Sequence, residues 1–460
     1  HNGQTLTYAE LVDWARDVAS RLGPRPGTVA VPATHKPATV AALLGIWLAG
    51  GVYCPIDPRF PADRQRAMRA AAGVGDAGVG GPGADDAGAR EVEPEGAYVL
   101  FTSGSTSAPK PVLTGHRAIA ITAGSLRDLF GLTETDRVLQ FASLNWDTCF
   151  EEILPALTSG ATLVFHDDAY SGSFPRFLRT IDNEQITVLD LPTAFWHELV
   201  NQLLEAGTRL PECLRVVIIG GEAVSPARLA DWCTLSTSGI RLINTYGCTE
   251  TTLITHAVDL HGPLALSLGP SWARSARAPI GRPLGHVVER LDPLSSADPA
   301  TGDRGELLIG GPSLAVGYRG RPQETAARFV ELPAGRFFRT GDRVSRLPNG
   351  MLTHEGRVDD TLKIRGVRVD PAEVEAHIAG HPSVSAVAVT GMSAGDHTVL
   401  AAFVVPRPMV GTAALNQELL EYLGGHVPAH LIPSRVSIVA DLPYTPSGKI
   451  DRPRIKEIYS

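Results

Sequence analysis

Apolar runs rich in β-branched residues alternate with segments of helical period along the first half of the chain. Residues 27–31 and 161–165 are two of these runs, and residues 9–22 have the spacing of a helix. Short buried strands that alternate with helices are typical of a mostly parallel sheet covered by helices. The pattern between residues 26 and 190 therefore predicts α/β layers.

From residue 305 the apolar runs become short and are separated by Gly and Pro turns, which predicts a small β-rich subdomain. Beyond Asp359 the pattern predicts a compact α+β tail, with a helix over 371–379 and a strand over 385–390. We therefore place the one domain boundary at Asp359. This boundary gives two domains, residues 1–358 and 359–460.

Composition narrows the class of protein. The chain has 460 residues, 43% of them hydrophobic, which is enough for more than one core. The net charge is −8 and no basic run is present, so a nucleic-acid partner is not expected. The most apolar stretch, residues 41–53, is short and broken by glycines, which predicts a buried helix leading to a strand instead of a membrane span.

The five cysteines have no paired spacing, which favours reduced thiols over a disulfide framework or a zinc site. Together with the absence of a secretory signal, this suggests a cytoplasmic protein. The cysteines are Cys54, Cys149, Cys213, Cys233 and Cys248.

The first motif that indicates chemistry is residues 101–110, Phe-Thr-Ser-Gly-Ser-Thr-Ser-Ala-Pro-Lys, directly after an apolar strand. Glycine and small hydroxyl residues let backbone N–H groups approach phosphate oxygens, and Lys110 supplies charge. The spacing is not that of a Walker A motif. Taken alone, such a stretch is more often an ordinary polar loop.

Three further motifs follow it. Residues 244–250, Asn-Thr-Tyr-Gly-Cys-Thr-Glu, offer an aromatic face, an amide and a carboxylate suited to Mg²⁺ beside phosphates. Asp342 and Arg357 provide an acid and a cation for ribose hydroxyls and phosphate. Residues 446–452 place Lys449 on a glycine turn. Each motif alone could be a surface loop, but their order and spacing together favour a nucleotide site.

With these motifs the sequence resembles the adenylate-forming superfamily of acyl-CoA synthetases, luciferases and peptide-synthetase adenylation domains over nearly the whole chain. The nonribosomal peptide synthetase branch matches best. The resemblance implies an α/β fold with a large N-terminal adenylate-forming core, two αβαβα layers plus a distorted β-barrel. It also implies a small mobile α+β C-terminal lid that is hinged at Asp359.

The resemblance also implies the reaction and its cofactors, ATP and Mg²⁺. A substrate carboxylate would attack the α-phosphorus of ATP, with Lys449 neutralising the developing charge. The lid would then rotate about Asp359 and bring the loop around Gly366 to the site. A carrier-protein phosphopantetheine thiol would finally attack the adenylate.

The resemblance assigns roles to individual residues. The catalytic set is Lys449, Glu250, Thr106 and Lys110, with Glu250 also holding Mg²⁺. The nucleotide-binding set is Thr102, Ser103, Gly104, Ser105, Gly221, Glu222, Ala223, Asn244, Tyr246, Gly247, Thr249, Asp342 and Arg357.

Asp147 lies where the amino-acid-specific branch places the carboxylate that pairs with the substrate α-ammonium. The alternative is an ordinary aspartate at a helix start, stabilised by the helix dipole. The remaining pocket positions are mostly small or apolar. They are Thr148, Glu151, Ala194, Ile218, Gly220, Thr245, Leu253 and Ile254.

Glu151 is the exception in this pocket. An unpaired carboxylate in an apolar slot is costly and is better explained if it meets a cation. We therefore expect a substrate with a cationic side chain, lysine first and then β-lysine or ornithine. The alternative is that Glu151 bonds a protein partner outside the slot and that the substrate is a neutral amino acid.

The chain departs from the family pattern at three positions. Ser107 and Pro111 replace usual glycines, and Cys248 replaces a usual proline, which we expect to loosen a turn. These departures favour a slower enzyme.

The alternative functions are an acyl-CoA-type ligase, which Asp147 and Glu151 argue against, and a catalytically silent adenylation-like scaffold. Lys449, Asp342, Glu250 and Lys110 argue against a silent module. No carrier segment follows Arg452, so the acceptor is expected to be a separate protein or domain. An MbtH-like activator could dock near residues 47–61.

Overall fold

The computed structural model describes two compact units. The first comprises His1–Pro58, Arg69–Phe101 and Pro111–Val358. The second comprises Arg59–Met68, Thr102–Lys110 and Asp359–Ser460. The described residues are 1–74, 96–102, 109–265, 277–294, 303–359, 361–395, 397–407, 414–443 and 450–459.

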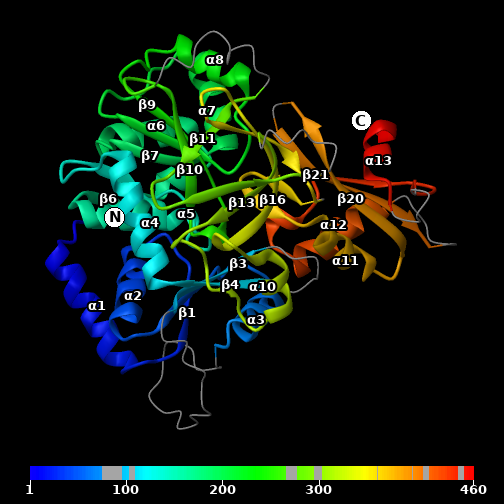
Figure 1. The fold of residues 1–460 in the computed structure, drawn as a ribbon, viewed down its shortest axis with the longest axis horizontal. Helices are drawn as coiled ribbons and strands as arrows, with labels where there is room; N and C mark the ends of the chain where they lie inside the picture. Colours follow the sequence, from blue (N-terminus) through cyan, green and yellow to red (C-terminus); the bar gives the residue numbers. More distant parts are fainter. Residues whose placement is uncertain are drawn as a thin grey trace. The chain divides into compact units, whose positions relative to one another are not determined.

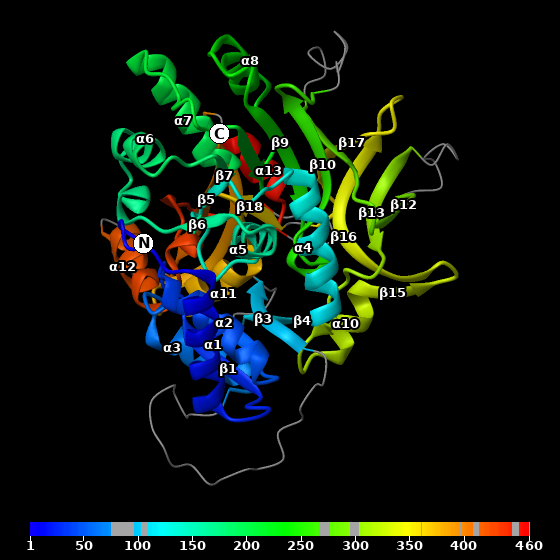
Figure 2. The same cartoon turned by 90° about the vertical axis from the view of Figure 1, so that its left-hand side faces the viewer.

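A sheet of twelve strands forms the centre of the first unit (Figures 1 and 2). Its parallel part has the order β9-β8-β7-β5-β6. These strands are β5 (Arg137–Leu139), β6 (Thr162–Val164), β7 (Val188–Pro192), β8 (Val216–Gly220) and β9 (Arg241–Gly247).

Helices cover both faces of the parallel strands. Val216 and Ile218 of β8 lie in one hydrophobic cluster, whereas Val217 and Ile219 lie in the other, as the two-residue period of a strand requires. The first cluster, here called the α5-side core, includes α4 (His116–Phe130) and α5 (Thr148–Ser159). The opposite cluster includes α6 (Phe174–Asn183), α7 (Thr193–Ala206) and α8 (Pro226–Thr234). The predicted α/β layers are therefore confirmed.

Antiparallel strands extend this sheet beyond β9, so the β-rich part begins well before residue 305, the start that the sequence pattern predicts. The reason is that β9 turns directly into β10 and hydrogen-bonds to it. These strands are β10 (Ile254–His261), β11 (Pro279–Pro283), β12 (Val288–Asp292), β13 (Arg304–Gly310), β15 (Phe329–Leu332), β16 (Gly335–Arg346) and β17 (Leu352–Arg357).

A second sheet has the order β1-β2-β3-β4-β14. Its strands are β1 (Thr28–Pro32), β2 (Val52–Ile56), β3 (Gly96–Thr102), β4 (Lys110–Gly115) and β14 (Gly317–Tyr318). Helix α1 (Tyr8–Leu22) begins with a capping box between Thr7 and Glu10. Helix α2 (Pro37–Leu48) is largely buried and leads into β2, as predicted for the most apolar stretch. The remaining elements are α3 (Ala62–Ala71), α10 (Pro322–Arg328) and the 3-10 helices η1 (Asp167–Tyr170) and η2 (Thr249–Thr251).

The second unit contains a sheet of the order β20-β21-β22 and a short hairpin, β18-β19. The helix predicted over 371–379 is confirmed as α11, and the predicted strand lies within β20. The strands are β18 (Leu362–Ile364), β19 (Val367–Val369), β20 (Val384–Ala394), β21 (His397–Pro406) and β22 (Arg435–Ile438). The helices are α11 (Pro371–Ala379), α12 (Leu415–His426), η3 (Ala429–Leu431) and α13 (Arg452–Tyr459).

Two further observations bear on the class of protein. All five cysteines are free thiols. None of the helices in the described part of the chain combines the length and the apolar composition needed to span a membrane.

Candidate active site

Asp147 is the N-cap residue of α5, and its carboxylate accepts a hydrogen bond from the Thr148 backbone N–H at 3.1 Å. Burial raises the pKa of Asp147 to about 6; Glu250 also acts to raise it, and hydrogen bonds from Thr249 and backbone N–H groups act to lower it. Asp147 is thus a helix-start aspartate, as the alternative interpretation expected. Its raised pKa also shows that its charged form lacks full compensation within the protein.

Glu151 lies one turn further along α5 and is buried. Its neighbour is Asp190 of β7, another acid, so the expectation that Glu151 meets a cation stays a prediction. Burial and the charge of Asp190 hold the pKa of Glu151 well above its usual range, which favours the protonated form of Glu151. The pKa of Asp190 is raised to about 7, chiefly by burial.

Asp190 was not among the residues picked from the sequence. The sequence feature that could have identified it is the position of this aspartate inside the apolar run Val-Leu-Asp-Leu of β7. A charge in the middle of a buried parallel strand is unusual and marks either a structural pair or a site. Because the pairing with Glu151 joins α5 to β7, only the three-dimensional structure reveals it.

The apolar pocket positions are brought together from three elements. Ile218 of β8 and Leu253 and Ile254 at the start of β10 belong to the α5-side core. Gly220 pairs in register with Thr245, and a Cβ atom at Gly220 would lie 2.5 Å from the Thr245 hydroxyl oxygen. The glycine therefore permits the close approach of the two strands.

Ala194 lies in the first turn of α7, which the Thr193 hydroxyl ties to the Gly220 carbonyl at 2.9 Å. The Thr245 hydroxyl donates to the Ile219 carbonyl at 2.9 Å. The two threonine hydroxyls therefore hold the end of β8 against β9 and against the start of α7. Thr148 is the first residue of α5.

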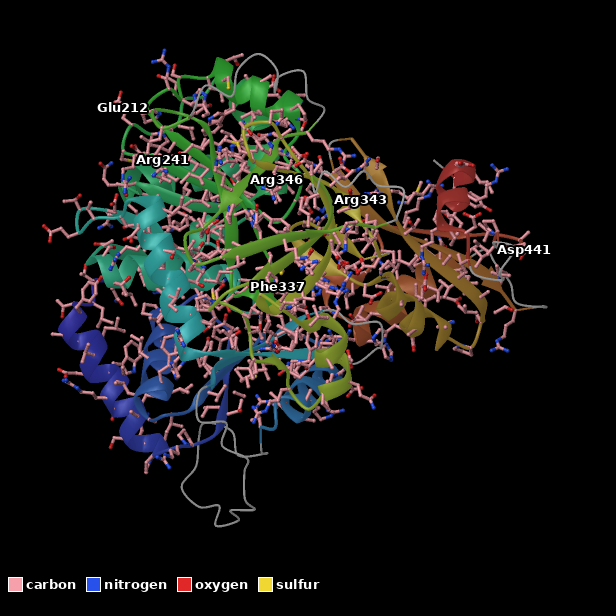
Figure 3. All side chains as sticks on the ribbon, in the orientation of Figure 1. Glu212, Arg241, Phe337, Arg343, Arg346 and Asp441 are labelled. Atoms are coloured by element: carbon pink, nitrogen blue, oxygen red, sulfur yellow. The ribbon has the colours of Figure 1, made fainter. Side chains whose placement is uncertain are left out.

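Tyr246, Asp342 and Arg357 converge from β9, β16 and β17. The Tyr246 hydroxyl donates to Asp342 Oδ2 at 2.6 Å, and Arg357 Nη1 donates to Asp342 Oδ1 at 2.6 Å. His354 Nε2 lies 3.2 Å from the same oxygen. Burial and the Asp342 carboxylate hold the pKa of Tyr246 well above its usual range, so the phenol remains a donor. Arg343, the next residue of β16, is labelled in Figure 3.

Glu250 is buried in η2, four residues after Tyr246, and accepts a hydrogen bond from the Tyr318 hydroxyl at 2.8 Å. One carboxylate together with substrate phosphates is a common way to bind Mg²⁺, so Glu250 fits the predicted role. Tyr318, which positions it, was not picked from the sequence. Among the described residues no three His, Cys, Asp or Glu side chains are grouped so that they could hold a metal ion by themselves.

Asn244 of β9 donates through Nδ2 to the Pro279 carbonyl at 2.7 Å. Gly247 ends β9, where a Cβ atom would lie 2.0 Å from the Leu253 carbonyl oxygen. In the turn that follows, the backbone N–H and the thiol of Cys248 lie 3.4 Å and 3.2 Å from the Thr251 hydroxyl. Thr249 begins η2.

The other predicted site residues occupy turns and strand ends. Gly221 follows β8 with a φ of 89°, and Glu222 and Ala223 follow it. Thr102 ends β3 and Lys110 begins β4, which continues with Pro111. The residues predicted here that lie outside the described residues are Ser103, Gly104, Ser105, Thr106, Ser107 and Lys449.

The predicted hinge and loop lie in the second unit. Asp359 is the first residue of its long segment, and its Oδ1 accepts a hydrogen bond from the Thr361 backbone N–H at 3.2 Å. Gly366 joins β18 to β19 with a φ of 79°, a conformation that favours glycine.

The model of the AMP-binding enzyme family matches residues 1–75 and 78–319, and that of the AMP-binding enzyme C-terminal domain matches 373–449. An isonitrile lipopeptide synthase from Streptomyces coeruleorubidus is 40% identical over 98% of this chain and 32% of its own length. The chain thus spans about a third of the length of the first curated relatives it matches.

Solved structures agree in fold. The amide bond synthetase McbA from Marinactinospora thermotolerans superposes with a TM-score of 0.84 at 23% identity, over 99% of this chain and 96% of that one. NpsA-ThdA from Klebsiella oxytoca, an artificially fused adenylation and PCP di-domain, has a TM-score of 0.76 at 26% identity, over 94% of this chain and 89% of that one. The chain belongs to the AMP-binding enzyme family, as an adenylation domain of the nonribosomal peptide synthetase kind.

Proposed function

We propose that this chain joins an amino acid to AMP, releasing pyrophosphate, and passes the aminoacyl group to a carrier-protein thiol. The observation that carries the proposal is the convergence of Tyr246, Asp342 and Arg357, with Glu250 shortly after Tyr246. An acid and a guanidinium suit ribose hydroxyls and a neighbouring phosphate, and the tyrosine ring offers a face for adenine.

In the first step a substrate carboxylate oxygen attacks the α-phosphorus of ATP. The bond from this phosphorus to the oxygen that bridges to the β-phosphorus breaks, and pyrophosphate leaves with the electron pair. Lys449 and Lys110 would neutralise the charge on the phosphoryl oxygens, and Thr102 to Lys110 would cradle the pyrophosphate. Mg²⁺, held by Glu250 and phosphate oxygens, would supply further positive charge.

In the second step a phosphopantetheine thiol loses its proton and attacks the carbonyl carbon of the adenylate. A C–S bond forms, the bond to the AMP oxygen breaks, and AMP leaves. The name of NpsA-ThdA as an adenylation and PCP di-domain supports a carrier partner. Rotation about Asp359 would bring the loop around Gly366 to the site for this step.

We further propose that the substrate side chain is cationic, lysine first and then β-lysine or ornithine. Glu151 and Asp190 support this, because the partner that Glu151 bonds is another acid, which cannot neutralise it. The alternative, a neutral amino acid, requires the pair to keep its shared proton throughout the reaction.

Mass-spectrometric detection of aminoacyl-AMP, with ATP, Mg²⁺ and each amino acid in turn, tests the first step. Asp147→Asn is expected to raise the KM for the amino acid about 10- to 100-fold, because a hydrogen bond to a charged group is lost, and to leave the KM for ATP unchanged. Activation of simple carboxylic acids, unaffected by this substitution, would favour an acyl-CoA-type ligase. No adenylate with any acid, even with an MbtH-like activator present, would favour a silent scaffold.

A further inference from the structure

His256 is a fully buried histidine on β10 that lies directly across from Tyr246 of β9. The two residues pair in the register of these antiparallel strands. Their rings make a T-shaped contact, with centroids 5.8 Å apart and planes inclined at 75°. Such a contact is a favourable arrangement of two rings. The tyrosine that offers a face for adenine is therefore packed against a titratable side chain that the proposed reaction does not use.

The hydrogen bonds around His256 place a proton on each of its ring nitrogens. The Thr255 hydroxyl donates its single proton to the Tyr246 carbonyl at 3.2 Å. In its 2.9 Å contact with His256 Nδ1 the hydroxyl must then accept, so Nδ1 carries a proton. The other nitrogen, Nε2, lies 2.8 Å from Glu289 Oε2, and an ionised carboxylate can only accept. His256 is therefore an imidazolium.

Glu289 of β12 is held in its ionised form. Burial acts to raise the pKa of Glu289, but hydrogen bonds from His256 and Arg346 outweigh burial and lower it. Arg346 of β16, labelled in Figure 3, donates through Nη1 to Glu289 Oε1 at 2.7 Å. The two oxygens of one carboxylate thus serve two cations, which joins β10, β12 and β16.

A buried charge at His256 is more than the packing of the strands requires. Removing an imidazolium from water is costly, and apolar residues of similar volume often replace buried ion pairs without loss of stability. His261, at the other end of β10, contacts the Thr237 hydroxyl at 3.1 Å, and burial lowers its pKa, which keeps it neutral at pH 7. Because a cation near the centre of an aromatic ring interacts with it electrostatically, we expect the charge of His256 to act on the Tyr246 ring.

We propose that His256 is a positioning residue for nucleotide binding, whose imidazolium fixes the Tyr246 ring in the orientation that stacks on adenine. This inference rests on the proposed role of Tyr246. The Tyr246 hydroxyl donates to Asp342 at 2.6 Å, so the ring is held both at its hydroxyl and beside its centre. Two such contacts restrict rotation of the ring and reduce the ordering cost of binding the base.

Calorimetric titration of the whole chain with ATP and with ribose 5-triphosphate, both with Mg²⁺ and without an amino acid, tests this role without turnover. His256→Gln is expected to weaken ATP binding about 3- to 30-fold, the range for one contact between a cation and a ring. It should leave the binding of ribose 5-triphosphate unchanged, because that ligand presents no base to Tyr246. A histidine that only joined the strands would affect both ligands alike.

Glu289→Gln is the second variant, because it keeps the size of the side chain and removes the charge that pairs with the imidazolium. It is expected to weaken ATP binding to a similar extent. The double variant should be no weaker than His256→Gln alone, since both substitutions act through one imidazolium. The matched control is His261→Gln, which should leave the affinity for ATP unchanged. Thermal unfolding of each variant shows whether the fold is retained.

The outcomes separate this inference from the proposed function. Equal weakening of both ligands by His256→Gln, unchanged ATP binding in that variant, or additive losses in the double variant would overturn the inference and leave amino-acid activation intact. Failure of the unmodified chain to bind ATP more tightly than ribose 5-triphosphate would also overturn it. A loss confined to ATP, in a chain that forms no adenylate with any amino acid, would support the inference and contradict the proposed function.

Discussion

At the scale of single residues, burial gives Asp147 its distinctive chemistry. The pKa of its carboxyl is raised to about 6, so this group is largely neutral at acidic pH and charged above pH 6. A charged carboxylate is needed to pair with an α-ammonium. The ability to bind an amino acid should therefore depend on pH in a range where an ordinary aspartate would not titrate.

We expect kcat/KM for the amino acid to rise as the pH increases through about 6, because kcat/KM reports ionisation of the free enzyme. The Asp147→Asn variant should lose this step. A profile for the unmodified chain that is flat between pH 5 and pH 7 would show that Asp147 does not control substrate binding.

The Tyr246 hydroxyl bonds a charged partner, Asp342, at 2.6 Å. Tyr246→Phe should lower the free energy of unfolding by about 1.5–3 kcal/mol, measured by denaturant titration, and raise the KM for ATP. Tyr8→Phe is the matched control, since its hydroxyl donates to the neutral Ala161 carbonyl at 2.7 Å. The control substitution should lower the free energy of unfolding by about 1 kcal/mol and leave the KM for ATP unchanged. An identical response of the two variants would contradict a nucleotide role for Tyr246.

At the scale of elements, the site depends on how strands end and turn. The junction of β9 with β10 carries Tyr246, Glu250 and Leu253. In this junction Gly247 packs against the Leu253 carbonyl so closely that no Cβ atom would fit between them. Thr252 and Leu253 have positive φ values of 60° and 67°, which are uncommon for residues with side chains. The turn thus stores backbone strain next to Tyr246 and Glu250.

Gly247→Ala is expected to destabilise the fold by about 1–3 kcal/mol or more, since a Cβ atom there would lie 2.0 Å from the backbone oxygen of Leu253. Gly239→Ala is the matched control, because nothing lies within 4 Å of a Cβ atom at that position. Thermal unfolding of the two variants measures the difference. Similar melting temperatures would show that the junction is looser than described.

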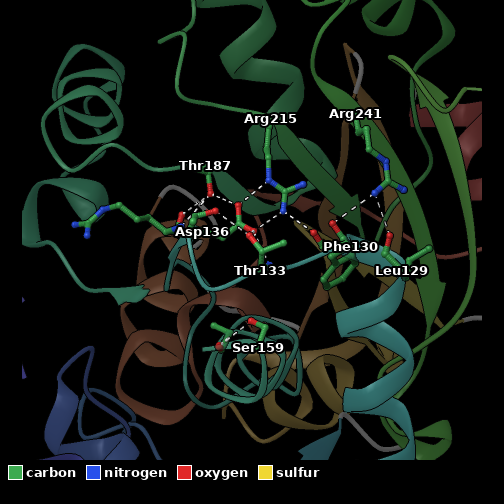
Figure 4. A network of polar contacts seen from close by, with 12 residues as sticks. Leu129, Phe130, Thr133, Asp136, Ser159, Thr187, Arg215 and Arg241 are labelled. Carbon is green, nitrogen blue, oxygen red and sulfur yellow. Dashed lines mark hydrogen bonds and ion pairs between the residues drawn. The ribbon is translucent and has the colours of Figure 1, made fainter. Parts of the chain in front are cut away.

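Asp136 directly precedes β5 and links the starts of the parallel strands, at the edge of the sheet opposite to the end of β9. Besides Arg215, whose Nε and Nη2 donate to it at 2.6 Å, Asp136 accepts hydrogen bonds from Thr187 and Thr133 (Figure 4). Arg215 also donates to the Gly131 carbonyl. Burial acts to raise the pKa of Asp136, but the hydrogen bonds outweigh burial and lower the pKa to about 2, so its contribution is complete above the unfolded value near 4 and is lost as the pH falls through about 2.

Arg215→Met should therefore destabilise the chain by about 1–2 kcal/mol at neutral pH, allowing for the partial exposure of the arginine. The difference in unfolding free energy between the two proteins should shrink as the pH falls from about 4 toward 2. A difference that stays constant over this range would show that the arginine acts by packing.

At the scale of the whole molecule, hydrophobic periodicity predicted the α/β layers because each strand between β5 and β9 presents one residue set to each helical layer. It also predicted α11 over 371–379 without error. The continuity of the large sheet through β10 escaped prediction, because strand pairing across a turn depends on backbone geometry and not on the apolar pattern.

The site was predicted unevenly for a related reason. Motif order identified Tyr246, Asp342 and Arg357, which the structure brings together although 96 positions separate Tyr246 from Asp342. The partnership of Glu151 with Asp190 could not be inferred, because a lone aspartate in an apolar run does not reveal which helix it faces. Long-range register supplies that information.

The measurement that tests the central claim most directly is amino-acid-dependent ATP–pyrophosphate exchange by the chain and by its Lys449→Ala variant, across the proteinogenic amino acids, β-lysine and ornithine. We predict exchange with lysine or a similar diamino acid that is lost in the variant. Exchange with no amino acid, with and without an added MbtH-like activator, would contradict the claim that this chain activates amino acids.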